Sequence, residues 1–517
     1  MPYTPPRYPF RPPTDSGARH PVVIVGGGMV GLTAALDLAQ HRIPVVLLDD
    51  DDTVSVGSRA ICHAKRTLEI FARLGIADDL LAHGVTWNTG RVFAGDRQVF
   101  AFDLLAEQGH EFPAFINLQQ YHLEERLVRA CRATGLVDLR WKSRIVGLST
   151  RPDATTLAIE TPDGPYTLHA DWLLAADGAR SFIRESLGLP FVGKTFRDRF
   201  LIADVTMKAA FPAERWFWFD PPFHPGGSVL LHRQADDLWR IDFQLGWNAD
   251  PEAERDPEKV RTRLVAMLGP NTEFELEWVS IYTFRCRRLQ KFRHGRILFL
   301  GDAAHQVSPF GARGGNGGIQ DADNLCWKLA AHLRGEAPDA LLDSYDAERI
   351  PAADENILNS TRSTDFITPK NEAAQAYRDA VLTLAARHPF ARPLVNSGRL
   401  SRPATYDPSP LNTPDDAAWP TGLPPGTPAA DALLADGWLL RQAGATFTAL
   451  IFGDTPTEMP PGITPLHLAA NGLAANRYGA AEGDIILLRP DQHVAARWHH
   501  HNPAAIATAM KRALGHG

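Results

Sequence analysis

The sequence predicts an α/β protein with a nucleotide-binding domain, an interleaved mixed-sheet domain and a small C-terminal α/β module. Three observations support this fold class. A short apolar run at residues 22–25 leads directly into a glycine-rich turn, as a buried strand of a βαβ unit does. Aromatic segments of alternating polarity lie between residues 195 and 290 and are typical of a more antiparallel sheet. A proline-rich stretch then separates two further strand-like runs near the C-terminus.

Composition and charge limit the functional classes. The 517 residues are 44% hydrophobic and 22% charged, which leaves enough apolar mass for a large core. The net charge of −7 argues against a nucleic-acid partner. The sequence has no run of 18 apolar residues and no N-terminal stretch of signal-peptide type, so we expect a cytoplasmic protein without a membrane partner. Four scattered cysteines without a CxxC pair predict neither a disulfide framework nor a metal site.

Changes in composition and residue patterning along the chain predict its division into parts. Six prolines between Pro2 and Pro13 predict a flexible tail, and eight between Pro403 and Pro428 predict a linker. In chain order, the predicted parts are the tail at 1–20, the first part of the nucleotide-binding domain at 21–194, the substrate-binding sheet at 195–290, the second part of the nucleotide-binding domain with further helices at 291–400, the linker at 401–430 and the C-terminal domain at 431–517.

The glycine-rich turn matches the GxGxxG pattern of a Rossmann-type site. Gly26 permits the tight turn, Gly28 lets the backbone approach a pyrophosphate, and Gly31 lets helix and strand pack closely. Asp49 ends the next predicted strand, 18 residues after Gly31, and can accept hydrogen bonds from a ribose. Strand, turn, helix and acid together predict a dinucleotide-binding βαβ unit.

A second cluster lies roughly 270 residues further on. An apolar strand ends in Gly301-Asp302, and a carboxylate at a strand end can hold a sugar-like chain. The glycine-rich stretch that follows offers free backbone N–H groups at a helix start, which suits the electron-rich edge of a ring or an anion. Two separated sites of nucleotide type imply one long ligand that spans both.

These motifs, together with the DGARSFIR segment at 177–184, carry a resemblance to a known family. Over about residues 20–360 the chain resembles the class A flavoprotein aromatic hydroxylases, the para-hydroxybenzoate hydroxylase superfamily. The segments 309–314 and 239–245 are most similar to 3-(3-hydroxyphenyl)propionate hydroxylases. The resemblance implies a Rossmann-type FAD-binding domain and a thioredoxin-like C-terminal domain. Because that domain lacks CxxC, we expect it to pack on the chain or to form a homodimer. The acidic run after Asp49 departs from the family pattern.

The resemblance also implies site residues. Asp302 would bind the ribityl chain of a non-covalent FAD, Asn316 would offer its amide to the flavin, and Pro309 would lie at the substrate side of the ring. Asp177 belongs to a motif implicated in FAD and NAD(P)H binding, with a purely structural turn as the alternative. The full expected cofactor set is Gly26, Gly28, Gly31, Asp49, Arg59, Gln120, Asp177, Asp302, Pro309, Gly314, Gly315 and Asn316.

The implied activity is a flavin-dependent monooxygenase. It would hydroxylate a phenolic aromatic compound ortho or para to a hydroxyl, using NADH or NADPH and O2 through a flavin C4a-hydroperoxide. An alternative keeps the flavin but hydroxylates or epoxidises a polycyclic natural product. A third, non-enzymatic alternative is a Rossmann-type binding module, which the intact Asp302 and Gly314–Asn316 cluster disfavours.

Candidate substrate residues come from the aromatic sheet. On the run 238–245, Arg240, Asp242 and Gln244 share one face, and His232 lies on the neighbouring run. The predicted substrate residues are Trp218, His232, Arg240, Asp242 and Gln244, with His232 as a candidate proton acceptor and Pro309 beside it in the catalytic set. Alternatives stay open: an Arg240–Asp242 salt bridge across the sheet, a structural His232 and a core position for Trp218.

Overall fold

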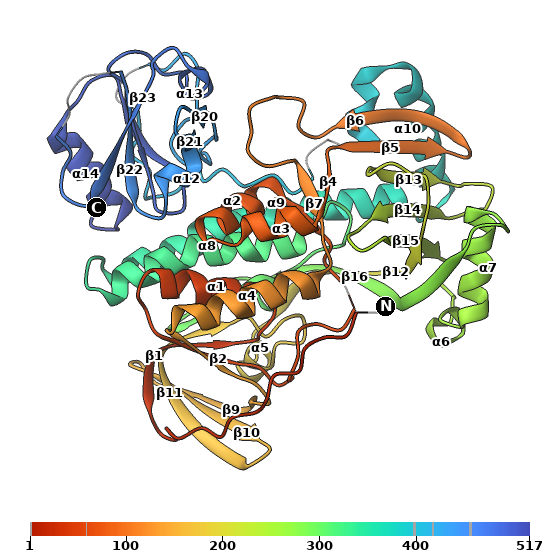
Figure 1. The fold of residues 1–517 in the computed structure, drawn as a ribbon, viewed down its shortest axis with the longest axis horizontal. Coiled ribbons are helices and arrows are strands. Elements are labelled where there is room, and N and C mark those ends of the chain that lie inside the picture. Colours follow the sequence, from red (N-terminus) through yellow and green to blue (C-terminus); the bar gives the residue numbers. More distant parts are fainter. Residues whose placement is uncertain (1–2, 58, 396–399, 416–417, 454–457) are drawn as a thin grey trace.

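The computed structural model describes residues 3–57, 59–395, 400–415, 418–453 and 458–517. Two large sheets lie at opposite sides of a group of long helices, and the C-terminal module sits beside the C-terminal half of helix α8 (Figure 1). Within the described ranges, no helix has both the length and the apolar character needed to cross a membrane.

The first sheet is the predicted Rossmann-type core. Its parallel strands follow the order β18-β11-β1-β2-β8, and helices α1, α4 and α8 lie against one face (Figure 1). The hairpin of β9 and β10 continues β11 in antiparallel fashion, and β17 forms the other edge. The bounds are β1 Arg19–Val25, β2 Val45–Leu48, β8 Val137–Arg140, β9 Arg144–Thr150, β10 Thr155–Thr161, β11 Gly164–Ala175, β17 Arg293–His294, β18 Ile297–Phe299, α1 Met29–Gln40, α4 Gln120–Thr134 and α8 Gly314–Leu333.

The second sheet has the strand order β19-β16-β12-β15-β14-β13-β5-β6 and is mostly antiparallel. Its strands are β5 Thr89–Ala94, β6 Arg97–Asp103, β12 Phe191–Met207, β13 Arg215–Phe219, β14 Ser228–Arg233, β15 Leu238–Leu245, β16 Phe274–Leu289 and β19 His305–Gln306. Strands β5 and β6 come from the first predicted part of the nucleotide-binding domain, at 21–194, and β19 comes from its second part, at 291–400. Strands β5 and β6 join the sheet through the parallel pairing of β5 with β13, a long-range contact that local alternation does not reveal.

One face of this second sheet is apolar and covered. Trp239 and Phe243 of β15 pack in one cluster with Val260 and Leu264 of helix α7. Because side chains alternate along a strand, Arg240 and Asp242 necessarily face the other way, toward the first sheet and its helices. The remaining elements of these two domains are α2 Lys65–Arg73, α3 Ala77–His83, α5 Phe182–Ser186, α6 Pro251–Glu254, α7 Pro257–Leu268, α9 Asp343–Ile367, α10 Glu372–Arg387, α11 Arg392–Val395 and a small sheet of β3 Cys62–Ala64, β4 Val85–Trp87 and β7 Phe115–Asn117.

The proline-rich N-terminal segment is not a free tail in the structure. Tyr8 is buried and stacks on Trp141 with ring centroids 4.6 Å apart, and Tyr3 stacks on Tyr121 at 3.9 Å. The backbone N–H of Tyr8 donates to the carbonyl oxygen of Asp52 at 2.7 Å. The two tyrosines of this segment stack on aromatic side chains of the first domain, and these contacts hold the extended segment on the surface of that domain.

The C-terminal module is a small α/β unit. Its strands β22 Phe447–Phe452, β23 Ile463–Leu468, β24 Ile485–Leu488 and β25 Val494–Trp498 follow the order β23-β22-β24-β25 and accompany α12 Leu439–Ala443, α13 Leu473–Tyr478, α14 Pro503–Ala513 and a short β20–β21 hairpin at 433–438. Phe447 and Ile451 share one hydrophobic cluster with Trp327 of α8 and Leu341. The module therefore shares a core with the first domain.

The predicted linker also packs tightly. Tyr406 is buried, its hydroxyl accepts a hydrogen bond from Nη1 of Arg349 at 3.0 Å, and its ring stacks on His493 at 4.4 Å. A buried charge cluster lies beside it. Glu348 of α9 accepts hydrogen bonds from Lys328 of α8 at 2.6 Å and from Arg489 of the C-terminal module, and Arg489 also pairs with Asp491. All four charged side chains are fully excluded from solvent.

We predict that Arg489→Met destabilises the protein by about 3–5 kcal/mol, because it leaves buried carboxylates without their main counter-ion. The matched control is Arg129→Met, which breaks the exposed pair of Arg129 with Asp79 and should change stability little. Urea unfolding followed by tryptophan fluorescence measures both. Equal transition midpoints for the two variants would show that the buried cluster is not needed to hold the module.

Candidate active site

A cavity of about 370 Å³ lies between the two sheets. Its walls come from the glycine-rich turn, the segment 59–63, the loop 307–316 and the polar face of the second sheet. The structure brings most of the predicted site residues together there: Gly28, Arg59, Gln120, His232, Arg240, Asp242, Asp302, Pro309, Gly314, Gly315 and Asn316.

The three motif glycines have different local roles. A Cβ atom at Gly26 would lie 2.3 Å from the carbonyl oxygen of Ala176, and one at Gly31 would lie 2.0 Å from that of Gly26, so both positions exclude any side chain. Gly28 is different, because the nearest atom to a Cβ there is Oε1 of Glu124 at 3.7 Å. The backbone before α1 is thus bare on its cavity side, and this fits the close approach of a pyrophosphate.

Asp49 stabilises the glycine-rich turn through hydrogen bonds to the backbone. Its Oδ2 accepts a hydrogen bond from the backbone N–H of Gly27 at 2.5 Å, and its Oδ1 accepts from that of Asp51 at 2.9 Å. Burial raises the pKa of Asp49 to about 6. The carboxylate holds the glycine-rich turn in place at the end of β2, and its contact with a ribose remains a prediction.

Glu124 is a site residue that sequence reasoning missed. This buried carboxylate accepts hydrogen bonds from the backbone N–H groups of Met29 at 3.2 Å and Ser55 at 2.8 Å. The side-chain amide of Gln120 donates to it at 2.8 Å, and the Gln120 carbonyl accepts from the backbone N–H of Ala60 at 3.2 Å. Gln120 and Glu124 thus fix the start of α1 and the segment that carries Arg59. Their spacing of four residues on one helix face was the available signal.

Asp302 lies opposite the turn, in the short 3-10 helix η1 (Gly301–Ala303) that follows β18. Its side chain is exposed within the cavity. Desolvation by the surrounding protein raises the pKa of its carboxyl group. Gly314, Gly315 and Asn316 form the first turn of α8, where backbone N–H groups have no acceptor within the helix. A carboxylate and free amides facing one cavity fit the ribityl chain and the polar edge of a flavin.

The side chain of Asn316 makes its hydrogen bonds to other residues of the protein. Its Oδ1 accepts hydrogen bonds from the backbone N–H of Ala64 at 2.9 Å and from the Thr67 hydroxyl at 2.7 Å, and its Nδ2 donates to the Ala312 carbonyl at 2.6 Å. These contacts lock the glycine-rich loop against β3 and α2. The backbone N–H groups of this segment stay available for a cofactor, and their contact with the flavin remains a prediction.

A buried carboxylate, Asp321 of α8, aligns the cofactor loop. Its Oδ2 accepts from the backbone N–H of Gly301 at 3.0 Å and contacts Nε2 of His305 at 2.6 Å. Its Oδ1 accepts from Nε of Arg349 at 2.7 Å, and Arg349 also donates to the Gly317 carbonyl at 3.1 Å. The sequence gives no direct signal for Asp321, because the partners lie on separate elements.

The polar sheet face forms the other wall. Arg215, His232, Arg240 and Asp204 stand opposite one another on the neighbouring strands β13, β14, β15 and β12. Arg240 makes two hydrogen bonds of 2.8 Å to the carboxylate of Asp204. The ion pair considered for Arg240 and Asp242 is therefore made with Asp204, one strand away.

Three buried polar atoms without a hydrogen-bond partner among the residues that the structure describes belong to the part of this face that meets the cavity: Oδ1 of Asp242, Nδ1 of His232 and Nε of Arg215. All three side chains line the cavity. Burial raises the pKa of Asp242 to about 7, and Asp204 adds to this rise while the two arginines oppose it. Burial, then the charges of Arg215 and Arg240, hold the pKa of His232 well below 6.5.

Two predicted substrate residues lie outside the cavity. Trp218 is three residues after Arg215, so it points to the covered face, where it stacks on Phe93 at 5.2 Å. Gln244 lies further along β15; its Oε1 accepts from the backbone N–H of Ser228 at 3.0 Å, and it lines a separate surface pocket. Asp177 accepts from the backbone N–H of Ile183 at 3.0 Å at the start of α5, and only its neighbours reach the cavity.

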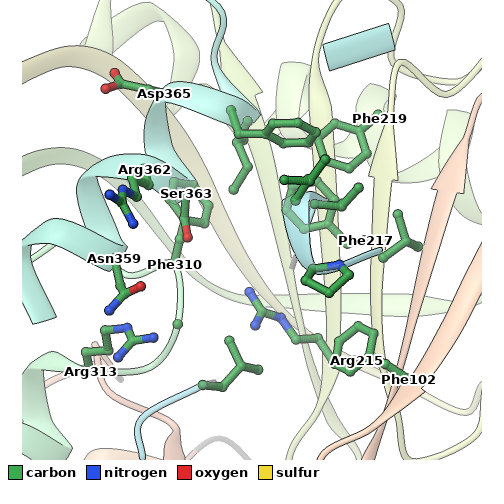
Figure 2. A pocket seen from close by; sticks show the side chains of 18 of the residues that line it. Phe102, Arg215, Phe217, Phe219, Phe310, Arg313, Asn359, Arg362, Ser363 and Asp365 are labelled. Carbon is green, nitrogen blue, oxygen red and sulfur yellow. The ribbon is translucent and has the colours of Figure 1, made fainter. Parts of the chain in front are cut away.

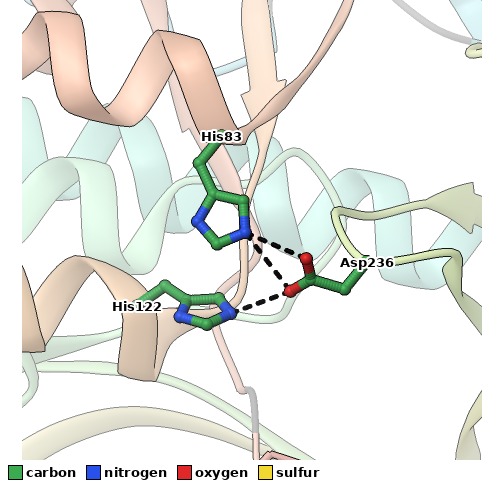
Figure 3. A group of neighbouring side chains, drawn as sticks. All are labelled: His83, His122 and Asp236. Carbon is green, nitrogen blue, oxygen red and sulfur yellow. Dashed lines mark hydrogen bonds and ion pairs between the residues drawn. The ribbon is translucent and has the colours of Figure 1, made fainter. Parts of the chain in front are cut away.

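A second polar cluster joins α3, α4 and the β14–β15 turn (Figure 3). Nε2 of His83 and Nε2 of His122 each lie 3.0 Å from the carboxylate of Asp236. Arg126 Nη2 lies 2.9 Å from Nδ1 of His83, and because arginine only donates, Nδ1 accepts and the proton of the neutral ring stays on Nε2. That tautomer donates to Asp236, so the cluster forms a hydrogen-bonded clamp in which Nε2 of His83 carries a proton and not a free lone pair.

Comparison with known proteins shows which family the chain matches. Residues 19–360 match the family described as FAD binding domain. The chain is 29% identical over 449 residues to a 3-(3-hydroxy-phenyl)propionate/3-hydroxycinnamic acid hydroxylase of Mycolicibacterium smegmatis, which covers 85% of this chain and 78% of the relative. It is 32% identical over 528 residues to a 6-methylpretetramide 4-monooxygenase of Streptomyces rimosus, which covers 94% and 92%.

A solved structure with a similar fold is that of the flavin-dependent monooxygenase PieE in complex with FAD and substrate. The TM-score is 0.82 with 23% sequence identity, over 96% of this chain and 99% of that one. At this identity the likeness concerns the fold, and it extends through the C-terminal module.

We predict that Asp302→Ala weakens FAD retention by about 1.5–3 kcal/mol, the usual value of a hydrogen bond to a charged group. The control is Asp50→Ala, since Asp50 is an exposed residue beyond the end of β2. Dilution of each variant followed by flavin fluorescence measures the dissociation constant. If both variants retain FAD equally, Asp302 does not hold the cofactor.

Proposed function

The chain belongs to the FAD binding domain family, and on this premise we propose that it hydroxylates a phenolic aromatic compound, ortho or para to an existing hydroxyl. The protein is an FAD-dependent monooxygenase of hydroxylase type. FAD, when bound, supplies the activation of O2 after its reduction by NADH or NADPH. The proposal concerns the substrate and the protein groups that act on it.

The observation that carries the proposal is the convergence of unpartnered polar groups on the wall opposite the predicted flavin loop. Asp242, His232 and Arg215 face the cavity from adjacent strands, and each has a buried polar atom without a partner in the described chain. Burying such atoms is costly unless a ligand satisfies them. The apolar side chains of Ile202 and Leu230 complete this wall, so the site suits a ring with a polar substituent.

Asp242 is the proposed proton acceptor. A phenol has a pKa of about 10, so transfer to a base of pKa about 7 costs ~4 kcal/mol, which the nearby charge of Arg240 offsets by stabilising the phenolate. Transfer to His232 costs more, since its pKa lies well below 6.5. We therefore assign His232 the role of a neutral hydrogen-bond partner in place of the expected base. The bidentate contact of Arg240 with Asp204 keeps the arginine in position.

A second candidate function is oxygenation of a polycyclic natural product. It is favoured by a further cavity that adjoins the first and is lined by several aromatic side chains. The two candidates separate in one assay. The purified enzyme is incubated with phenolic acids and with polycyclic phenols, substrate-dependent NAD(P)H oxidation is recorded, and products are identified by mass spectrometry.

We predict that kcat/KM for a phenolic substrate rises with pH through about 7 and then levels off. Burial raises the pKa of Asp242, so its carboxylate is protonated and unable to accept a proton below that value and is ionised above it. Asp242→Asn should abolish this rise and lower kcat/KM roughly a hundredfold or more. Steady-state rates between pH 5.5 and 9, roughly the range in which the group titrates, measure both effects.

The matched control is Asp220→Asn. Asp220 follows β13 in the same sheet, is exposed and binds the backbone N–H of Gly226, a contact that asparagine can also make. This variant should keep the pH profile of the parent. A parent profile that is flat through pH 7, or one that persists in Asp242→Asn, would assign the proton acceptor to another group.

A further inference from the structure

We propose that the adjoining cavity binds a distal part of the same substrate, namely a second aromatic ring system that carries an acidic group. The inference deepens the proposed function and rests on it, since it takes the reacting phenol ring to lie in the flavin-side cavity. It names the substrate class as acidic phenols with an extended, planar body.

The adjoining cavity has a volume of about 640 Å³ and lies between strands β5, β6 and β13 and the helices α9 and α10 (Figure 2). Arg215, Phe310, Arg313 and Leu400 line both cavities, so the two spaces meet along these residues. A single phenol ring needs only the flavin-side cavity. The additional volume is in the range that accommodates a drug-sized molecule.

Strand register explains why the two cavities meet. Phe102 of β6, Gly90 of β5, Arg215 of β13 and His232 of β14 form one row across the sheet and share a face. Gly90 leaves room for the ring of Phe102, because a Cβ there would lie 2.2 Å from the Phe102 Cζ atom. Arg215 therefore stands at the junction, with the flavin-side cavity on one side and the aromatic cavity on the other.

The walls of the adjoining cavity suit a flat aromatic ligand. Phe217 and Phe219 project from β13 with ring centroids 4.6 Å apart, and Phe366 and Tyr377 approach from α9 and α10. Phe310 stands at the junction and contacts Phe200 and Phe284 edge to face. Aromatic side chains favour stacked and edge-to-face contacts with other rings, so this arrangement selects a planar aromatic body over an aliphatic chain.

The charge balance favours an acidic group. Asp365, the acidic side chain in the described lining of this cavity, binds Lys194 at 3.0 Å, and Arg91 of the lining is paired with Glu214 at 2.8 Å. Across the junction, Asp242 lines the flavin-side cavity, where it is the proposed base. Arg215 has no ion-pair partner within the described part of the chain, and its Nε is buried. Figure 2 shows Arg215 reaching in from the sheet, with Arg313 and Arg362 on the opposite side. A carboxylate or acidic enol at the junction would satisfy Arg215.

The test compares two anthraquinone probes with phenol. Rhein is a dihydroxyanthraquinone carboxylic acid, and danthron is the same dihydroxyanthraquinone without the carboxylate. Isothermal titration calorimetry of the FAD-loaded enzyme gives the dissociation constants. We expect rhein to bind at least tenfold more tightly than danthron, and both to bind more tightly than phenol. Equal binding of rhein and danthron, or binding of neither above the level of phenol, would overturn the inference.

Two variants locate the effect. Arg215→Gln should reduce the rhein-to-danthron preference to less than twofold, because danthron lacks the anion that Arg215 pairs with. Ser363→Trp should fill the adjoining cavity from α9 and weaken rhein at least tenfold relative to phenol, whereas Ser363→Ala should keep the ratio of the parent. A preference for rhein that survives Arg215→Gln, or a ratio unchanged by Ser363→Trp, would place the probe elsewhere.

Failure of this inference is distinct from failure of the proposed function. If phenols are hydroxylated but the anthraquinones show no preference, the reacting ring binds as proposed and the adjoining cavity has another role. If no phenol of any size gives an oxygenated product, the proposed function itself is wrong. Product analysis and calorimetry thus report on the two proposals separately.

Discussion

The cofactor side of the site depends on one buried carboxylate, Asp321. It is fully excluded from solvent and receives hydrogen bonds from the Gly301 amide and His305 of one segment and from Arg349 of helix α9. A buried charge is tolerated only when its partners are fixed, so the carboxylate holds the Gly301–Asp302 turn, the start of α8 and helix α9 in one geometry. Arg349 extends this constraint to the Tyr406 hydroxyl in the segment that leads to the C-terminal module.

The substrate side depends on strand alternation and register. One face of the second sheet is committed to a tryptophan- and phenylalanine-rich core beneath α7, which leaves every second residue of the same strands for the cavity. Register then decides which of these residues meet. It aligns Arg215, His232, Arg240 and Asp204 in one row and places Asp242 in the next.

Local motifs were sufficient to predict which segments form the cofactor-side wall of the cavity. Gly26, Gly28 and Gly31 act through contacts within a few residues or with the adjacent strand, and Asp302 and Asn316 follow directly from a strand end and a helix start. The substrate side was only partly predictable, because alternation fixes relative faces but not which face is covered. Trp218, a predicted substrate residue, lies on the covered face, whereas Arg215, three residues earlier and absent from the predicted set, lines the cavity. Asp321 and the β5–β6 hairpin depend on long-range pairing, which no local spacing encodes, whereas for Glu124 the four-residue spacing from Gln120 was a local signal.

Helix α8 joins the cofactor to the last part of the chain. It begins at the cavity with Gly314 and contacts the shared core through Trp327. The pair of Lys328 and Glu348 is completed by Arg489, which binds the same carboxylate. During synthesis, residue 489 leaves the ribosome long after both of the cofactor segments. The helix that presents the flavin-side amides therefore reaches its final environment only when translation is nearly finished.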